Sequence, residues 1–344
     1  MKVYEITIKP VTGFGTPLKG DTIFGHFCWQ VSYDEGLLGK SISDLLLNYH
    51  TRPFAVFSSA LPKFCEGNEY VYALKTPDLP LDKLFTLPED KKDRIKKRKE
   101  FKSRRWMMVK EGKRISSFQG LDFLSDKDLL VKAKSTLTDE TRKAIRRAGV
   151  SNFIAIYSQP RNTINRNTGT TGDEGFAPFK VGQHVYYPET ELALFVGIDD
   201  VININQIREG LERIGKCGFG KDSSTGLGRF ELGEESEIVL SDIGSESHDA
   251  CYTIGPCVPE KDTYSEMFFT PFTRFGRHGD VLAKSSNPFK NPVIMADEGG
   301  IFIPKSRDVF DKPYIGRAVT NVSKAEPRAV TQGYSLYIPV RVEV

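Results

Sequence analysis

A glycine-rich segment between residues 218 and 230 carries the side chains and backbone best suited to binding an anion. It contains two Gly-x-Gly pairs, Gly218/Gly220 and Gly226/Gly228, around a polar stretch with Lys221, Ser223 and Ser224. Glycine reaches backbone angles closed to other residues and lets another backbone come close. Consecutive free N–H groups in such a loop form a concave anion site. Phosphate binding is therefore the chemistry that this segment could supply.

The position of this loop disfavours two nucleotide-binding motifs. Residues 210–217 match the start of a P-loop but end in cysteine where Ser or Thr is required, and residues 215–222 end in aspartate, which would repel phosphate. A P-loop and a dinucleotide-binding loop both lead from a strand into a helix N-terminus. Here the apolar spacing over 204–214 predicts a helix before the loop, and the alternation over 229–232 predicts a strand after it.

His26 is the best candidate for acid–base chemistry among the histidines, because it follows a Gly-rich loop near the start of the chain. Metal-independent RNA cleavage would need such a histidine beside a reactive 2′-hydroxyl, with partners to hold the phosphate. No second histidine, tyrosine or lysine is visibly coupled to it in the sequence. The absence of an HExxH or GGDD-type signature disfavours a metal-dependent phosphodiesterase or cyclase. We expect neither a metal nor another cofactor.

A second polar segment covers residues 161–171. It combines Arg161, Asn162, Asn165 and Arg166 with several threonines. Two arginines with amides and hydroxyls could hold phosphates, ribose hydroxyls and splayed bases. The alternative is an ordered turn in which the Asn and Thr side chains bond locally. Residues 274–279 form a third cluster of this kind, and together the three segments favour nucleic-acid binding.

Charge is distributed unevenly along the 344 residues, although the net charge is only +3. Residues 91–114 hold thirteen Lys and Arg against three acidic residues, and residues 142–147 form a second basic run. Residues 231–246 are acidic. This asymmetry suggests one face made for a polyanion, with a solvated helix surface as the alternative.

Length and cysteine content place the chain in a broad class. A chain of 344 residues is comfortable for two domains. Its five cysteines are odd in number and sparse, and none forms a CxxC pair, which disfavours a structural zinc site. No apolar run approaches a membrane span, and the first ten residues lack the apolar core of a signal peptide. We expect a reduced, cytoplasmic protein without a membrane partner.

Hydrophobic periodicity outlines the first domain. Alternation at residues 4–8 predicts a strand, and an apolar stripe predicts a helix over 21–31 with Asp21 as its N-cap. Further strands are expected at 152–157, 182–187, 192–198 and 229–232, with a helix at 204–214. Residues of about 60–150 look like a charged insertion that is partly helical from 89 to 105. Without it the order is the βαββαβ pattern of a ferredoxin-like domain.

The remainder of the chain is rich in predicted strands. An acidic segment with Ser and Gly, residues 233–249, marks a candidate boundary. Strands are expected at 251–258, 267–275, 293–303 and 334–344. We therefore predict an α+β protein with two domains, 1–235 and 236–344. The second would be a degenerate copy of the ferredoxin-like unit.

Four segments carry a resemblance to a known family. Residues 13–29, GFGTPLKGDTIFGHFCW, together with 161–171, 218–228 and the closing strand 332–340, resemble the RAMP superfamily of CRISPR proteins. The chain looks most like the subunit that caps type III-A (Csm) effector complexes and grips the 5′ tag of the guide RNA. The resemblance spans nearly the whole chain apart from residues 60–150.

This resemblance implies a fold, a role and partners. Members consist of two ferredoxin-like, RRM-related domains with a Gly-rich loop after the second helix, and they are not catalytic. The implied partners are the crRNA 5′ tag, the large polymerase-like subunit and the backbone RAMP subunit, with target RNA reached only indirectly. The implied RNA-binding residues are Lys19, Arg161, Asn162, Asn165, Arg166, Gly218, Gly220, Lys221, Ser223, Ser224, Gly226 and Gly228.

Two alternatives stay open at this stage. The guide-processing nuclease is a sister RAMP protein, so a metal-independent endoribonuclease using His26 is one of them. Glutamine is common at this position in the family, so the histidine does not by itself imply cleavage. The equivalent subunit of a Cmr-type (III-B) complex is the other.

Overall fold

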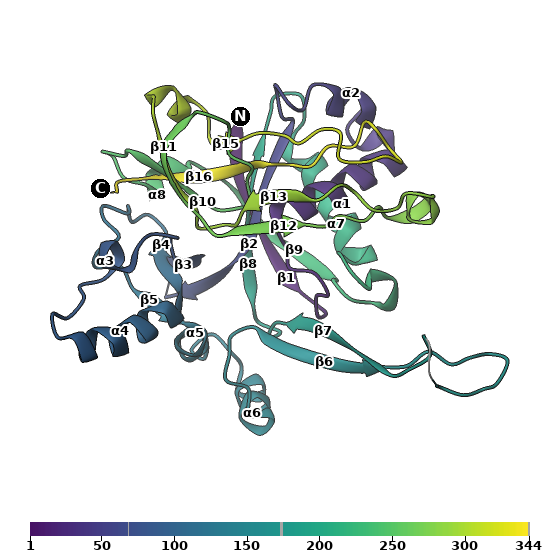
Figure 1. Cartoon of the computed structure of the whole chain (residues 1–344), viewed down its shortest axis with the longest axis horizontal. Coiled ribbons are helices and arrows are strands. Elements are labelled where there is room, and N and C mark those ends of the chain that lie inside the picture. The colour runs from purple at the N-terminus through teal and green to yellow at the C-terminus, as the bar shows by residue number, and fades with distance from the viewer. Residues whose placement is uncertain (68, 173–174, 343–344) are drawn as a thin grey trace.

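The fold is a mixture of helix and antiparallel sheet, and Figure 1 shows its layout. The structure is a computed structural model that describes residues 1–67, 69–172 and 175–342. A seven-stranded sheet and a five-stranded sheet form its two main layers, with two smaller two-stranded sheets. Among the described residues no helix is both long and apolar enough to cross a membrane.

Four strands and two helices form the centre of the first part. The strands β1 (Lys2–Pro10), β2 (Ala55–Glu66), β8 (Glu191–Ile198) and β9 (Phe230–Ile238) lie in the order β2-β8-β1-β9, and each neighbouring pair is antiparallel. The helices α1 (Gly20–Tyr33) and α7 (Ile204–Cys217) pack against each other. Gly210 of α7 makes this approach possible, because a Cβ there would lie 2.4 Å from the ring of Phe27.

The second strand of the ferredoxin-like pattern, counted along the chain, is β2, and it lies earlier in the chain than the sequence predicted. Residues 60–66, assigned to an insertion, belong to β2, whereas the predicted strand at 152–157 overlaps β6 (Ala155–Arg161) in a separate hairpin with β7 (Phe179–Val185). β2 is buried along most of its length, so it lacks the alternation of a half-buried strand. A register shift after Phe57 also interrupts it, where Ser58 Oγ accepts the N–H of Phe195 at 2.9 Å.

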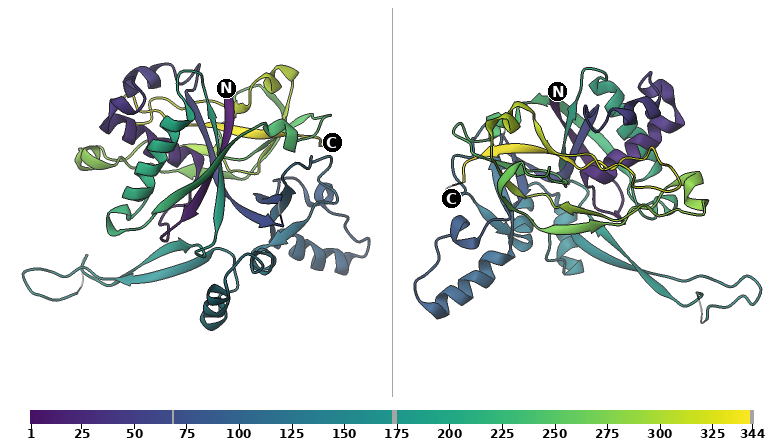
Figure 2. Two further views of the ribbon diagram at one scale, coloured as in Figure 1. Left: turned by 180° about the vertical axis from the view of Figure 1, so that it is seen from behind. Right: turned by 45° about the horizontal axis from the view of Figure 1, so that its top comes forward.

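Residues 69–148 extend the central sheet rather than forming a detached insertion. Strands β3 (Glu69–Lys75), β4 (Arg104–Lys110) and β5 (Phe123–Ser125) continue it beyond β2. The helices of this region are α3 (Leu81–Leu84), α4 (Lys91–Ser103), α5 (Asp126–Ala133) and α6 (Asp139–Ala148). The helix expected within 89–105 is confirmed as α4. The β6–β7 hairpin projects away from the body in every view (Figures 1 and 2).

The C-terminal part contains mostly strands, as the sequence predicted, but its strands are shorter. The five-stranded sheet has the order β11 (Tyr264–Phe268), β14 (Ile301–Pro304), β10 (Ala250–Thr253), β16 (Tyr334–Val340), β15 (Tyr314–Gly316), and β12 (Pro271–Arg274) pairs with β13 (Val293–Ala296). The predicted strands 267–275 and 293–303 are interrupted at 269–270 and at 297–300, so each forms two shorter strands. The last two residues of the predicted strand 334–344 lie outside the described residues. Two short helices, α2 (Ile42–Leu47) and α8 (Leu240–Ile243), complete the layers.

One apolar core joins the two sheets. Buried side chains of β1, β2, β8, β10 and β16 belong to the same cluster. Gln332, which is fully buried, ties the layers together, because its amide accepts the N–H of Phe57 at 3.0 Å and donates to the carbonyl of Phe57 at 2.7 Å. The predicted boundary after residue 235 falls inside β9, which runs to Ile238.

Candidate nucleic-acid interface

The glycine-rich loop connects α7 to β9, as the sequence predicted, and its four glycines all have left-handed backbone angles. Their φ values are +97° for Gly218, +73° for Gly220, +94° for Gly226 and +75° for Gly228. A side chain is disfavoured at each of these angles. The loop shape therefore depends on glycine at every one of these positions.

Three of the four glycines make room for the protein's own chain rather than for a ligand. A Cβ on Gly228 would lie 2.1 Å from the carbonyl oxygen of Phe219, and one on Gly218 would lie 2.5 Å from that of Leu227. A Cβ on Gly220 would lie 2.6 Å from the Cβ of Thr16. Only Gly226 faces open space. At Gly218, Gly220 and Gly228 the space that a side chain would take is therefore filled by the chain itself.

His26 fixes the loop from α1. Its Nε2 accepts the N–H of Gly220 at 3.1 Å, and its ring lies 4.7 Å from the buried ring of Phe219. Burial lowers the pKa of His26 to about 4, so the ring is neutral near pH 7. A neutral ring whose Nε2 lone pair accepts a backbone hydrogen bond is poorly placed to act as an acid or a base. The geometry gives His26 a structural task instead.

The segment at residues 12–16 lies against the loop. Thr16 Oγ1 accepts the N–H of Lys221 at 3.0 Å, and Thr12 Oγ1 accepts the N–H of Arg229 at 3.0 Å. The N–H of Gly228 donates to the carbonyl of Gly13 at 2.8 Å. These bonds use three of the backbone donors that could have faced an anion. The exposed groups that remain include the side chains of Lys221, Ser224 and Arg229.

The β6–β7 hairpin reaches the same place through Arg161. Its guanidinium lies 3.5 Å from Asp222 Oδ2, and it donates to Thr225 Oγ1 at 3.3 Å. The structure thus brings the segments around 13, 161 and 220 together. Beyond Arg161 the hairpin leads outward, where Asn162 and Arg166 are exposed. Asn165 instead stabilises the turn, because its Oδ1 accepts the N–H of Asn167 at 2.9 Å.

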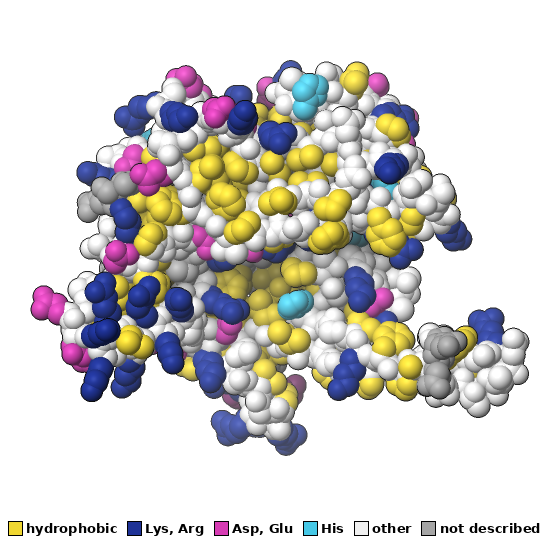
Figure 3. Space-filling view, viewed as in Figure 1, with side chains coloured by type: hydrophobic (Ala, Val, Ile, Leu, Met, Phe, Trp, Pro, Cys, Tyr) yellow, Lys and Arg dark blue, Asp and Glu magenta, His cyan; other side chains and the backbone are white. Residues whose placement is uncertain are grey.

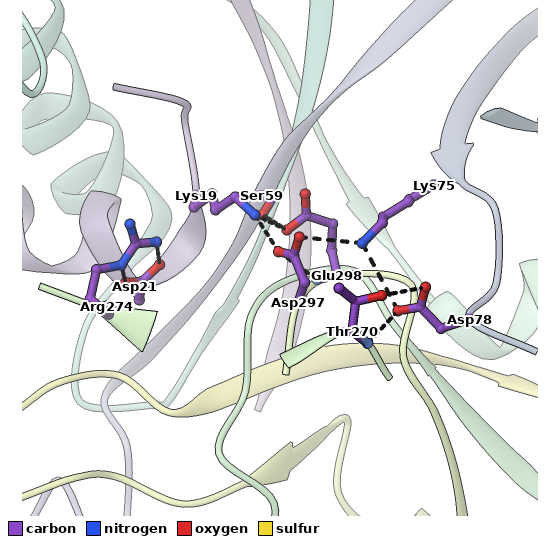
Figure 4. A network of polar contacts seen from close by, with 9 residues as sticks. All are labelled: Lys19, Asp21, Ser59, Lys75, Asp78, Thr270, Arg274, Asp297 and Glu298. Atoms are coloured by element: carbon purple, nitrogen blue, oxygen red, sulfur yellow. Dashed lines mark hydrogen bonds and ion pairs between the residues drawn. The ribbon is translucent and has the colours of Figure 1, made fainter. Parts of the chain in front are cut away.

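Lys19 lies in a network of ion pairs between the two layers (Figure 4). Its ammonium contacts Asp297 and lies 3.1 Å from Glu298, at the turn between β13 and β14. Although burial opposes the charge, these two carboxylates raise the pKa of Lys19. Burial raises the pKa of Glu298, which shares this site. Lys19 was predicted to bind RNA, and the structure shows its charge already neutralised within the chain.

Asp21 and Arg274 form a second pair in the same view. Asp21 was expected to cap α1, but the N-cap is Lys19 and has no side-chain cap bond. The Asp21 carboxylate instead accepts two hydrogen bonds from Arg274, at 2.6 and 2.9 Å. Such bidentate pairs are strong and directional. Arg274, from the third polar cluster, therefore stabilises the contact between α1 and β12.

The sequence did not predict a groove of about 580 Å³ between the α3–α4 region and the β11–β12 turn. Its walls include Lys102, Arg105, Trp106, Tyr186 and Phe269. Figure 3 shows a hollow across the middle of this face, with Lys and Arg side chains gathered over the lobe that holds α4. The basic run at 91–114 was the available signal, but only the fold places it beside a groove.

Comparison with known proteins connects these observations to a fold. No protein-family model matches the chain, and no curated protein matches it either. A solved structure of a Csm1–Csm4 cassette in complex with pppApA contains a chain that aligns with a TM-score of 0.54 at 15% identity, covering 99% of this chain and 98% of that one. A Csm3–Csm4 subcomplex of the type III-A CRISPR–Cas interference complex aligns with a TM-score of 0.54 at 15% identity, covering 98% and 99%.

Csm4 is the component that these two assemblies share. The chain has the fold of Csm4. A third structure, a Csm1–Csm4 cassette with cA3, aligns over 100% of both chains with a TM-score of 0.52 at 14% identity. The likeness to Csm4 therefore extends over the whole length of the chain, including the parts that the sequence resemblance left unmatched.

Proposed function

We propose that this chain is the Csm4-like capping subunit of a type III-A CRISPR ribonucleoprotein, that it grips the 5′ tag of the crRNA and that it is not an enzyme. The observation that carries the proposal is the alignment over the whole chain with structures of Csm4 complexes. Those structures contain Csm1 in one case and Csm3 in the other. We infer that this chain likewise bridges a large signalling subunit and a backbone subunit.

The domain organisation belongs to the same proposal. The strand order β2-β8-β1-β9, with α1 and α7, supports a ferredoxin-like first domain. The C-terminal part has an antiparallel sheet without two long helices among its described residues, which is what a degenerate second copy would look like. We place the division after β9, at Ile238 rather than at residue 235.

The proposed RNA contacts are the exposed groups around the glycine-rich loop. Lys221 and Ser224 protrude from the loop, and Asn162 and Arg166 from the adjacent hairpin. Lysine and arginine would neutralise phosphates, and the smaller polar groups would bond ribose hydroxyls or base edges. Gly218, Gly220 and Gly228 act by shaping the loop, and Ser223 and Arg161 by bracing it. Because His26 Nε2 already accepts the Gly220 N–H, it supports a binding role for the loop and gives no support to the nuclease alternative.

Tag recognition is tested in the assembled complex with two guide RNAs, one complete and one lacking the 5′ repeat tag. The double variant K221Q/S224A should bind the complete guide several-fold more weakly and discriminate less between the two. The matched control is K261Q, because Lys261 is an exposed lysine in the C-terminal part. Equal binding of both guides by the unmodified complex would contradict tag recognition.

Partner choice is tested by co-purification. The tagged chain should retain a Csm1-type and a Csm3-type subunit when all subunits are co-expressed. Recovery of Cmr-type partners instead would favour the type III-B alternative. Site-specific cleavage of repeat RNA by the purified chain in the presence of a chelator, lost in H26A, would overturn the non-catalytic assignment.

A further inference from the structure

A row of cations on one side of α4 leads into the groove described above. Lys102 lines the groove near the end of this helix. Because residues four apart lie on the same side of a helix, Arg94 and Arg98 continue the row toward the helix N-terminus. All three side chains are exposed. Among the residues that the structure describes, no carboxylate pairs with any of them.

The row is not needed to hold α4 in place. Like charges four residues apart destabilise a helix, so these cations oppose its formation. The helix is instead stabilised by Asp90, whose carboxylate accepts the N–H groups of Lys92 and Asp93 at 2.9 and 3.0 Å. It is anchored by Phe101, whose ring stacks on that of Phe85 at 4.2 Å. Because these unpaired cations repel one another and lower the stability of the helix, they point to a ligand outside the chain.

The groove offers a different chemistry from the row. Trp106, Tyr186 and Phe269 provide aromatic surface along its walls. Its acidic side chains Asp78 and Glu298 are balanced, because they lie 4.0 Å from the ammonium of Lys75 and 3.1 Å from that of Lys19. The interior of the groove is therefore close to neutral and partly aromatic, whereas its rim at Lys102 and Arg105 is cationic.

The groove lies close to the glycine-rich loop. Tyr186 contacts Phe14 edge to face, with ring centroids 5.8 Å apart, and Phe14 in turn contacts Phe219 at 6.5 Å. Residues 17–19 line the groove, directly after the segment that bonds to the loop. The groove and the loop therefore lie on either side of the segment 12–19, with the buried rings of Phe14 and Phe219 packed beneath it.

We propose that the groove and the row on α4 form a binding site for a single-stranded polynucleotide. Arg94, Arg98, Lys102 and Arg105 neutralise successive phosphates, and the groove receives an unstacked base against its aromatic walls. An acidic protein surface would use the cations but not the aromatic groove, so the combination favours nucleic acid. The proposal does not depend on recognition of the 5′ tag, because neither element belongs to the glycine-rich loop.

The test uses the full-length chain and a fluorescent single-stranded RNA of mixed sequence without the repeat tag, titrated over a series of salt concentrations. In R94Q/R98Q/K102Q, the slope of log K against log salt should fall by about 2, since each phosphate contact contributes about 0.7. The matched control is K92Q/K96Q/K99Q, which removes the same charge from another side of the same helix. Its slope should change by less than half as much.

Base binding in the groove has its own readout. The chain has two tryptophans, so W29F leaves Trp106 as the only indole. The same RNA should quench the fluorescence of Trp106 in W29F, and adding R94Q/R98Q/K102Q should shift that quenching to higher RNA concentration. Thermal unfolding of each variant verifies that the fold is retained.

Three outcomes would overturn the proposal. One is an unchanged salt slope in R94Q/R98Q/K102Q, and a second is an equal loss in the control variant. The third is loss of a partner subunit from the complex with RNA binding intact, which would make the row a protein-docking surface. Failure of tag discrimination in the assembled complex would leave this result untouched, because the probe carries no tag.

Discussion

The glycine-rich loop and helix α4 are both basic in sequence, but the fold uses their cations differently. Around the loop, Lys19 contacts Asp297 and Glu298, and Arg161 lies beside Asp222. On α4 the row that leads to the groove has no such partners among the described residues. Lys19 and Arg161 therefore hold the protein together, while Arg94, Arg98 and Lys102 of α4 remain free for a ligand.

The two regions also differ in what fixes their backbone conformation. The loop is fixed by four left-handed glycines and by hydrogen bonds to His26, Thr16 and Gly13. Helix α4 is an ordinary capped helix with one buried aromatic anchor. Substitutions of the loop glycines and of His26 should therefore change the stability of the fold, whereas those of Arg94, Arg98 and Lys102 on α4 should change binding alone.

The largest expected effect is on the loop backbone. G228A should reduce the free energy of unfolding by at least about 3 kcal/mol, because the left-handed angle adds strain and the new Cβ would overlap the Phe219 carbonyl. G226A carries the strain without the overlap and should cost about 1 kcal/mol. Denaturant unfolding of both variants measures the difference. Equal costs would contradict the claim that Gly228 accommodates the chain itself.

An intermediate effect is expected at Lys19. K19M should destabilise the protein by about 2 kcal/mol at neutral pH, because it removes the cation from Glu298 and leaves Asp297 with Lys75 alone. The cost should shrink as the pH falls, since Glu298 has a raised pKa and takes up a proton first. The exposed, unpaired Arg98 is the comparison, and R98Q should change stability by less than about 0.5 kcal/mol. If K19M were as stable as R98Q, the contrast between paired and free cations would be lost.

The smallest effect is expected at His26. H26A should cost about 1 to 2 kcal/mol near pH 7, because the Gly220 N–H loses its acceptor. H26Q should cost less, since its amide oxygen can accept the same bond.

The pH dependence of stability separates the burial of neutral His26 from the hydrogen bond that it accepts. Its pKa in the folded protein, about 4, lies below its ordinary value of 6.5, so its contribution is present above pH 6.5 and is lost as the pH falls toward 4. The wild-type protein should therefore lose stability relative to H26Q over that window in paired unfolding curves. Parallel curves would show that His26 is not buried in its neutral form.

Local patterns predicted much of the first part of the fold, and tertiary context explains the errors. The apolar spacing at 204–214 and the alternation at 4–8 correspond to α7 and β1. The sequence missed β2 because a strand buried along most of its length has no alternation, and because Ser58 and Ser59 interrupt its apolar run. It misplaced Asp21 because a carboxylate before a helix suggests a cap, whereas its actual partner, Arg274, lies 253 residues away.

The sequence by itself indicated the loop, because each Gly-x-Gly pair favours left-handed turns, although distant partners such as His26 and Thr16 fix its shape. It also determined the excess of positive charge at 91–114, because charge is a property of composition. The tertiary structure alone decided which cations are free. Pairing depends on residues far apart in the chain, such as Lys19 with Glu298, meeting within about 4 Å, and only the packing of the two sheets sets that distance.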